Sequence, residues 1–366
     1  MNHNTANPAP KQRLASLDVL RGFSLFMLVG LQPVLVMLLS TANLPAFDGV
    51  LYQLDHEVWQ GLRVWDMVMP LFLFMSGTSM PFSLAKYTCG ELSRRHAITK
   101  ILRRVLLLWL LGMVVQGNLL TLDWSQLKFY TNTLQAIAAG YLITSFAMLL
   151  LGSSIKRLAL SAATLLVLYC VPMLVVGDFT PEDNLANLID AAVMGSRRGD
   201  PSYTWILSSL TFGVTVMLGA IAGCIMRQKT NSTHGAAVWL TASGVLMIVL
   251  SLLLSGIEPV IKRIWSGSFT LLSGGICFLL MAVAYWLIDV RKSCRCLLWL
   301  KIYGLNSIVA YMIGETVNFR SVVESVSYGL QPLLNDYYAV WLCFGNFAIV
   351  FAILYVLNRA GIFLKV

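Results

Sequence analysis

Long runs of apolar residues alternate with short polar connections along this chain of 366 residues. Several runs reach the roughly 20 residues that a helix needs to cross a bilayer. Helices are favoured there because they satisfy their backbone hydrogen bonds within one segment. The pattern predicts spans near 17–40, 64–85, 100–121, 132–153, 158–176, 204–226, 236–256, 266–289, 298–317 and 338–358. We therefore expect an all-α, polytopic integral membrane bundle of about ten transmembrane helices.

Composition supports the same class of protein. Hydrophobic residues make up 58% of the chain and charged residues 12%, whereas soluble domains are about 45–50% apolar and about 25% charged. The first fifteen residues are polar, and the first apolar run is long enough to span a membrane. A cleavable signal peptide is therefore not expected.

The net charge of +9 raises the question of a nucleic-acid partner. An even number of spans puts both termini on one side, and 19 of the 26 Lys and Arg residues fall on that side or at the adjoining helix ends. Basic residues mark the cytoplasmic side of membrane proteins. We expect both termini in the cytoplasm and no nucleic-acid binding. The predicted parts are a tail over 1–16, a single transmembrane domain over 17–360 and a tail over 361–366.

The seven cysteines do not predict a metal site or a disulfide framework. Four of them lie inside predicted spans, where they behave as small apolar residues. Cys294 and Cys296 share a loop that has no histidine or second cysteine pair nearby, which argues against zinc. We expect no bound metal.

One of the four histidines stands out by its position. His3, His96 and His234 lie in polar segments, whereas His56 lies where the second apolar run enters the membrane. An imidazole there can exchange a proton near neutral pH. A histidine at a membrane interface can equally be a structural, hydrogen-bonded residue, so position alone leaves both interpretations open.

Other polar residues are predicted to lie in the same outer layer. They are Gln32, Asp66, Asn132, Gln135, Lys262, Arg263, Ser307, Tyr311 and Glu315. Ser307, Tyr311 and Glu315 are spaced by four and share one helical face. Structural alternatives exist: Lys262 and Arg263 are also placed to snorkel to the interface, and Pro70 removes the hydrogen bond to the Asp66 carbonyl and favours a kink. A carboxylate at membrane depth costs about 2.5 kcal/mol or more, which favours a function for Asp66 or a partner such as Arg63.

Several segments together resemble the heparan-α-glucosaminide N-acetyltransferase family. The segments are RLASLDVLRG (13–22), HEVWQGLRVWD (56–66), PLFLFMSGTSM (70–80), NTLQAIAAGY (132–141), NLIDAAVMG (187–195), Asp200-Pro201, IKRIWSGSF (261–269) and NSIVAYMIGE (306–315). Their order and spacing, over most of the length, carry the resemblance. Two departures stand out: Gln32 replaces the Asn of the animal enzyme, and Gln135-Ala136 replaces the usual Gln-Arg.

The resemblance implies a membrane acetyltransferase that moves an acetyl group from cytosolic acetyl-CoA to an amino sugar or glycan on the extracytoplasmic side. It places His56 on the family's catalytic histidine and makes 17–360 a transmembrane acyltransferase domain. A short chain of this build is similar to homologues of the bacterial inner membrane. The expected partners are acetyl-CoA, the amino sugar and the lipid bilayer, with a homodimer left open.

Acyl transfer from a thioester needs a base for the attacking group and donors for the oxyanion. We predict His56 as base or acyl carrier and Asp66, Gln32 and Asn306 as further catalytic residues; the oxyanion donors are expected among Gln32, Asn306 and Lys262. The acid that orients His56 is left open among Asp66, Asp190, Asp200 and Glu315. The predicted substrate-binding residues are Trp59, Gln135, Lys262, Trp265, Ser307, Tyr311 and Glu315. For acetyl-CoA we predict Arg21 and Asp18, with Arg103 and Arg104 on the same basic face.

The competing hypothesis is a secondary transporter for a small sugar-like or anionic solute. About ten spans and polar residues near an outer vestibule suit a carrier. The two halves of the chain, however, lack a matched pair of broken helices, the usual sign of an inverted repeat. The single outward histidine favours the enzyme. The sequence leaves open N- or O-acetylation, and direct transfer or an acetyl-histidine intermediate.

Overall fold

The computed structural model describes residues 14–84, 87, 93–117, 119, 123, 126–228, 233–292 and 295–364. Helices and loops make up this part of the chain, and no strand is formed within these ranges. One isolated antiparallel bridge joins Gln60 and Ile261. The expectation of an all-α protein is confirmed at this level.

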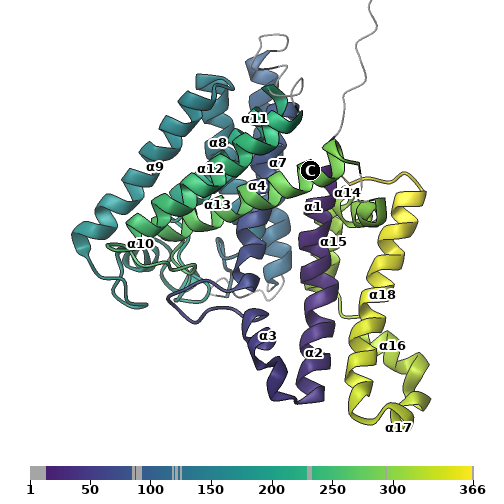
Figure 1. The fold of residues 1–366 in the computed structure, drawn as a ribbon. Helices are drawn as coiled ribbons and strands as arrows, with labels where there is room; N and C mark the ends of the chain where they lie inside the picture. Colours follow the sequence, from purple (N-terminus) through teal and green to yellow (C-terminus); the bar gives the residue numbers. More distant parts are fainter. Residues whose placement is uncertain are drawn as a thin grey trace, which may run out of the picture.

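The helices fall into three consecutive groups (Figure 1). The N-terminal group contains α1 (Ala15–Phe26), η1 (Met27–Leu31), α2 (Gln32–Ala42), η2 (Pro45–Phe47) and α3 (Asp48–Gln53). The central group contains η3 (Val64–Met67), α4 (Val68–Thr78), α5 (Met80–Ser83), α7 (Arg94–Gln116), α8 (Thr133–Leu151), α9 (Ile155–Val176), α10 (Leu185–Met194), η4 (Gly195–Arg197), α11 (Ser209–Gln228), α12 (Thr233–Leu254), α13 (Gly267–Ala284) and η5 (Tyr285–Val290). The C-terminal group contains η6 (Arg295–Leu300), α14 (Lys301–Leu305), α15 (Ser307–Thr316), α16 (Arg320–Ser327), η7 (Tyr328–Leu330), α17 (Gln331–Leu334), η8 (Asn335–Tyr337) and α18 (Tyr338–Arg359).

Helix α11 is the axis of the central group. It is buried along almost its whole length and packs against α4, α8, α9 and α13. The crossing with α4 is close: a Cβ on Gly77 would lie 1.8 Å from the carbonyl oxygen of Val216, and one on Gly219 would lie 1.9 Å from that of Phe74. Small residues permit such backbone approach between membrane helices. Because α4 directly follows the His56 loop, this crossing fixes one wall of the site.

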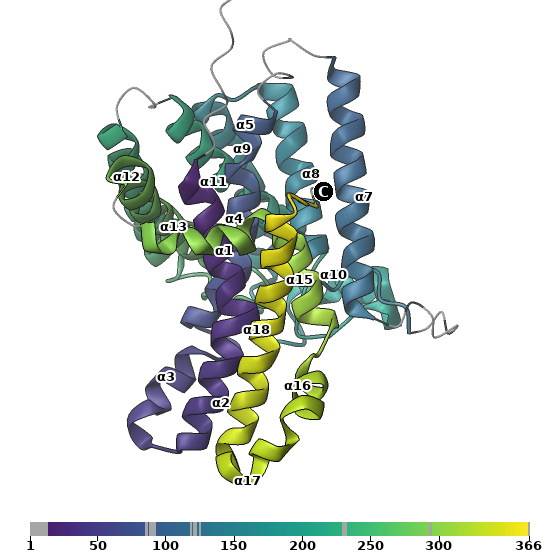
Figure 2. The same ribbon diagram turned by 90° about the vertical axis from the view of Figure 1, so that its right-hand side faces the viewer.

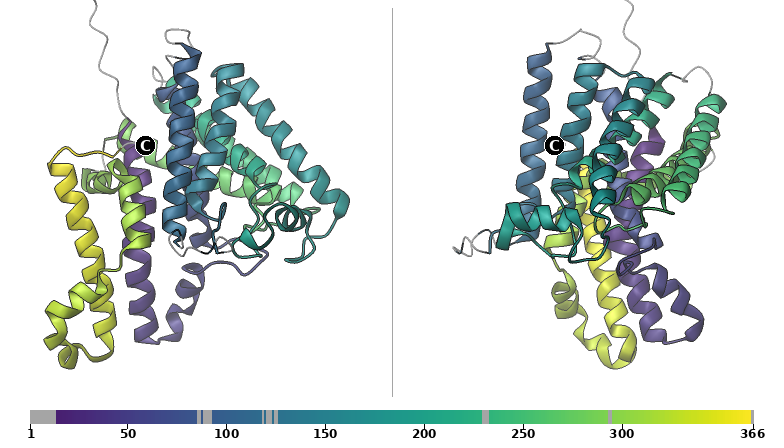
Figure 3. Two further views of the ribbon diagram at one scale, coloured as in Figure 1. Left: turned by 180° about the vertical axis from the view of Figure 1, so that it is seen from behind. Right: turned by 90° about the vertical axis from the view of Figure 1, so that its left-hand side faces the viewer.

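The first helical rod is continuous from α1 through α2 but changes register in its middle. Pro33 has no N–H for the carbonyl of Val29, and the chain forms the π-helix η1 just before it, with Gln32 donating its backbone N–H to the carbonyl of Met27. A π-turn absorbs one extra residue within a helix. In Figure 3 this rod (purple) lies between α18 (yellow) and the central helices. Figure 2 shows α2, α3, α16 and α17 together at one end of the molecule.

Seven segments of the described chain are long and apolar enough to cross a membrane by length and composition. They are Ala15–Ala42, Thr133–Leu151, Ile155–Val176, Ser209–Gln228, His234–Leu254, Gly267–Val290 and Arg320–Arg359, the last of which contains α18. Seven of the predicted spans coincide with these segments. A multi-pass membrane protein is therefore supported.

The other three predicted spans are helical but do not meet the same criteria. The span predicted over 64–85 is divided into a 3₁₀ turn and the short helices α4 and α5. The span over 100–121 overlaps α7, which carries five Lys and Arg residues. The span over 298–317 is interrupted at Asn306, whose backbone lies outside the α region. The described chain thus yields seven candidate membrane helices by length and composition, and the predicted count of about ten is not confirmed.

The start of α1 and the end of α18 lie at the same end of the molecule (Figure 1). Helix α14 packs closely on α1 there, because Gly22 and Gly304 let the two backbones meet. The prediction that the two ends share one side agrees with this arrangement; which side of a membrane they face stays a prediction.

Candidate active site

The loop between α3 and η3 carries His56 and is held by the segment between α12 and α13. Gly61 adopts a φ of +130°, which favours glycine, and donates its backbone N–H to the carbonyl of Val260 at 2.8 Å. The neighbouring bridge between Gln60 and Ile261 continues this contact. Residues about 200 apart in sequence are therefore brought together by backbone pairing, and Lys262 comes next to His56.

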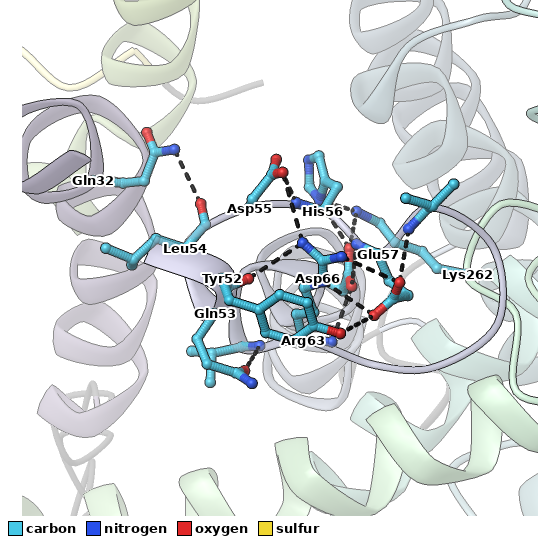
Figure 4. Close-up of polar contacts among 12 residues, drawn as sticks. Gln32, Tyr52, Gln53, Leu54, Asp55, His56, Glu57, Arg63, Asp66 and Lys262 are labelled. Carbon is cyan, nitrogen blue, oxygen red and sulfur yellow. Dashed lines mark hydrogen bonds and ion pairs between the residues drawn. The ribbon is translucent and has the colours of Figure 1, made fainter. Parts of the chain in front are cut away.

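His56, Asp66 and Lys262 form a triangle of polar contacts (Figure 4). His56 Nδ1 lies 2.8 Å from Asp66 Oδ1 and 2.9 Å from Lys262 Nζ, and Lys262 Nζ donates to Asp66 Oδ1 at 3.0 Å. The Asp66 side chain is fully buried and that of Lys262 is 8% exposed, whereas the imidazole is 43% exposed. The ring therefore has one edge on the buried pair and leaves Nε2 for the cavity.

The same carboxylate also closes the loop that contains His56. Asp66 Oδ2 accepts the backbone N–H groups of Glu57 at 3.2 Å and Arg63 at 3.0 Å. Because the buried Asp66 accepts hydrogen bonds from Glu57 N, Arg63 N and Lys262 Nζ and also lies 2.8 Å from His56 Nδ1, it is held as the carboxylate. Among the four acids considered for orienting His56, Asp66 is the one that the structure brings into contact with it. The ten-residue separation is bridged because residues 54–63 are not helical.

The side chain of Arg63 does not pair with Asp66, contrary to the expected partnership. Its Nε and Nη2 donate to the two carboxylate oxygens of Glu57 at 3.0 and 3.2 Å, and its guanidinium lies 3.8 Å from the centre of the Tyr52 ring. The hydrogen bond from Arg63 lowers the pKa of Glu57. This ion pair ties the two ends of the 57–63 loop together, so that both backbone amides reach Asp66.

The segment between α12 and α13, which carries Lys262, is fixed by hydrogen bonds to its backbone. Tyr169 and Ser208 both donate to the carbonyl of Ile264, at 2.6 and 2.9 Å, and Glu258 accepts the backbone N–H of Gly267 at 2.8 Å. Trp265 adopts a φ of +51° and its indole donates to Thr215 at 3.1 Å. Several hydrogen bonds to one short segment can hold a strained backbone conformation in place. Here they also fix the position of Lys262.

A cavity of about 380 Å³ opens in front of the exposed edge of His56. We call it the histidine cavity. Its polar and charged lining includes His56, Gln116, Thr131, Asn132, Asp200, Lys262, Arg263, Tyr311 and Glu315, and its aromatic lining includes Trp65, Phe72, Tyr203, Trp205, Phe212 and Trp265. Aromatic walls with a few convergent polar groups are typical of small-molecule sites.

A second cavity, of about 760 Å³, lies between α1, α4, α7, α8 and α15. We call it the basic cavity. Its lining includes Arg21, Lys100, Arg103, Arg104, Ser76, Ser79, Ser83, Ser307, Tyr141 and Leu364, and it contains no acidic residue within the described chain. The two cavities share Phe72, Thr133 and Tyr311 in their linings. They therefore meet at these three side chains.

Several predicted site residues lie in these two cavities. His56, Lys262, Trp265, Tyr311 and Glu315 line the histidine cavity, and Arg21, Ser307 and Tyr311 line the basic cavity. Arg103 and Arg104 also face the basic cavity. The predicted polar stripe of α15 thus extends from one cavity into the other.

Asp66, buried against His56 and Lys262, lies outside the linings of both cavities, and so do five other predicted site residues. Four of these five hydrogen-bond backbone groups. Gln32 donates to the carbonyl of Leu54 at 3.2 Å, and Trp59 donates to that of Phe179 at 2.8 Å. Gln135 caps α8 and is 1% exposed. Asn306 bonds Ile362 and Leu364. The fifth, Asp18, is 6% exposed within α1.

Five aromatic wall residues were not predicted as site residues from the sequence: Trp65, Phe72, Tyr203, Trp205 and Phe212. Trp65 adjoins Asp66 within the segment already singled out. Trp205 is placed because Asp190 accepts the backbone N–H groups of Trp205 and Ile206, at 2.7 and 3.0 Å. No local pattern marks such a residue, since its position depends on a buried acid 15 residues away.

We predict that Asp66→Ala lowers the free energy of unfolding by about 3 kcal/mol or more, because the partly buried amide of Glu57, the buried amide of Arg63 and the buried Nζ of Lys262 lose their acceptor. Thermal unfolding of the detergent-purified protein, followed by tryptophan fluorescence, measures the change. The double variant Asp66→Ala/Lys262→Met removes one orphaned donor and should regain part of the loss. An Asp66→Ala protein that melts with the wild type would contradict this account of the loop.

Comparison with known proteins identifies distant relatives. No family model matches the chain. Heparan-alpha-glucosaminide N-acetyltransferase of Homo sapiens is 23% identical over 370 residues, which cover 83% of this chain and 53% of the relative. The Mus musculus protein of the same name is 23% identical over 378 residues, 86% of this chain and 56% of the relative. The chain therefore spans about half the length of the curated relatives it matches, and its similarity to them supports a distant relationship to this group of acetyltransferases.

Proposed function

We propose that this chain is a membrane acetyltransferase that moves an acetyl group from acetyl-CoA in the basic cavity to an amino sugar in the histidine cavity. The observation that carries the proposal is the meeting of the two cavities at Phe72, Thr133 and Tyr311. A thioester held at that point would have the imidazole of His56 on one side and basic residues on the other. The distant relatives, which are named as N-acetyltransferases, support the same reaction class.

The basic cavity fits the chemistry of the donor. Coenzyme A carries phosphate groups, for which arginine provides fork-shaped sets of donors. The guanidinium of Arg104 lies 4.3 Å from the centre of the Tyr141 ring, and its buried Nε has no hydrogen-bond partner within the described chain. The buried Ser76 hydroxyl is likewise without a partner there. Phosphate and amide oxygens of the donor would satisfy such groups.

The histidine cavity fits a sugar that bears an amine. Flat aromatic side chains, including Trp65 and Trp205, offer apolar faces for a pyranose ring. The carboxylates of Glu315 and Asp200 line the same space and would attract a protonated amine before it reacts. The relatives' name, which specifies a glucosaminide and N-acetylation, supports an amine rather than a hydroxyl as acceptor.

In the proposed reaction, His56 Nε2 takes one proton from the neutral amine as its nitrogen attacks the thioester carbonyl. The C–N bond forms, the C–S bond breaks, and the proton passes from Nε2 to the departing sulfur, so that the products are the acetamide and free coenzyme A. Asn132 and Tyr311 line the cavity and would hydrogen-bond the developing oxyanion in this reaction. They replace Gln32 and Asn306 in this role, because the carboxamides of those two residues are bound elsewhere.

His56→Ala and His56→Gln should both reduce acetyl transfer by about 10²–10⁴-fold, because neither side chain accepts a proton at neutral pH. The assay supplies acetyl-CoA and glucosamine to the purified protein and follows both free thiol and acetylated sugar. Gel filtration and thermal unfolding check that the variants remain folded. Near-normal turnover in both variants would exclude His56 as base or acyl carrier.

The same assay separates the remaining alternatives. A carrier would return the thioester intact, so the absence of thiol with wild-type protein would favour the transporter. Release of one equivalent of coenzyme A per protein without acceptor would assign an acetyl-histidine intermediate. Direct transfer predicts no release until the amine is added.

The double variant Arg103→Gln/Arg104→Gln should raise the KM for acetyl-CoA about 10²- to 10⁴-fold, because it removes two charge-assisted hydrogen bonds that contribute about 1.5–3 kcal/mol each. The KM for glucosamine should change little. Arg95→Gln is a matched control, since Arg95 is exposed on the same helix and does not line the basic cavity. An unchanged KM for acetyl-CoA in the double variant would remove the basic cavity from the donor site.

A further inference from the structure

We propose that Lys262 is a positioning residue that acts through His56: its protonation state selects the imidazole tautomer and thereby decides whether Nε2 can accept a proton. The inference rests on the proposed function, since it concerns how the base of that reaction is made available. It replaces the earlier expectation that Lys262 binds substrate or donates to the oxyanion. The contacts that lead to it are those of the triangle in Figure 4.

The donors and acceptors in the triangle limit the proton arrangements that it can hold. An ammonium group has three donors and no acceptor, and a neutral imidazole has one of each. His56 Nδ1 lies within hydrogen-bond distance of both Lys262 Nζ and Asp66 Oδ1. Nδ1 can accept from Lys262 or donate to Asp66, but it cannot do both. The two contacts therefore belong to two different proton arrangements.

With Lys262 charged, its ammonium donates to Nδ1 and to Asp66. The single proton of the neutral ring is then on Nε2, and the edge that faces the histidine cavity is a hydrogen-bond donor. With Lys262 neutral, Nδ1 carries the proton and donates to Asp66, which leaves the lone pair of Nε2 free. The second arrangement is the one that can remove a proton from an amine.

Two observations indicate that Lys262 can reach the neutral state. Its side chain is 8% exposed, and Asp66, its one acidic contact among the described residues, already accepts two backbone N–H groups. Burial lowers the pKa of Lys262, against the opposing effect of Asp66. Other charged groups surround the triangle: Asp55, Glu57 and Arg63 in the loop, Arg263 beside Lys262, and Asp200 and Glu315 across the cavity. Two phenols, Tyr203 and Tyr311, also line the cavity.

The pair Lys262→Met and Lys262→Arg tests the inference, because the two substitutions have opposite expected effects. In Lys262→Met, Nδ1 has only Asp66 as a partner, so Nε2 is always free. Acetyl transfer should stay within about tenfold of wild type at the optimum, and the acid limb of the pH profile should move to lower pH. In Lys262→Arg, a guanidinium that does not deprotonate holds the ring in the unreactive tautomer, and activity should fall about 10²-fold or more at every pH.

A structural or oxyanion-binding role gives the reverse order, since Arg keeps the cation and Met removes it. Activity in Lys262→Arg equal to or above that of Lys262→Met would therefore overturn the inference. A Lys262→Met pH profile that superimposes on that of wild type would also overturn the inference. This measurement does not depend on whether the Lys262→Arg variant folds. Absence of acetyl transfer in the wild type would instead refute the proposed function, so the two failures are distinguishable.

Discussion

The carboxylate of Asp66 is the interaction on which the site depends. It is fully buried, it accepts hydrogen bonds from two backbone amides and a lysine, and it lies 2.8 Å from the imidazole nitrogen of His56. A buried charge is tolerated only when its partners replace water, and here the partners come from the His56 loop and from the segment between α12 and α13. One side chain therefore joins two parts of the chain about 200 residues apart. The position of His56, the proposed base, follows because the buried carboxylate of Asp66 needs hydrogen-bond donors from the His56 loop.

The surrounding helices determine which way the His56 loop and the segment between α12 and α13 face. The close crossing of α4 and α11 at Gly77 and Gly219 holds the start of α4 against the buried axis of the molecule. Phe72, one turn into α4, then projects to the point where the two cavities meet. Charge is distributed unequally around this point. The basic cavity contains no acid within the described chain, whereas the histidine cavity contains both signs. An anionic acetyl donor would thus be drawn to the basic cavity and a cationic acceptor to the histidine cavity, on the two sides of Phe72, Thr133 and Tyr311.

The helical class and most of the spans were predictable because bilayer thickness and hydrophobic periodicity act locally along the sequence. The three spans that differ have local causes as well. Basic residues interrupt the apolar run of α7, a 3₁₀ turn precedes α4, and Asn306 breaks the helix between α14 and α15. At Asn306 the break in the helix accompanies a contact with a distant segment, since the Asn306 side chain accepts the backbone N–H of Leu364. Such contacts are tertiary and have no signature in a window of sequence.

The candidate site was predictable in part for the same reason. His56 was identified by its position at a span boundary, Asp66 by the cost of a carboxylate at membrane depth, and Lys262 by its predicted place in the same outer layer. Their contact was not predictable, because it requires that the 54–63 loop be non-helical and bridged to Ile261. The carboxamides illustrate the limit: Gln32 and Asn306 were predicted as catalytic donors and Gln135 as a substrate-binding residue, and all three bond backbone groups in the fold. The sequence shows which polar groups would be costly to bury. The fold shows which hydrogen-bond partners offset that cost.

The central claim is that an acetyl group passes between the two cavities, from a donor on the basic side to an amine on the other. Sealed proteoliposomes in which the protein has one orientation test it directly, with labelled acetyl-CoA outside, facing the basic side, and glucosamine trapped inside. The account predicts that label accumulates on the trapped glucosamine while free coenzyme A remains outside. Label that forms only when glucosamine and acetyl-CoA are on the same side would contradict it.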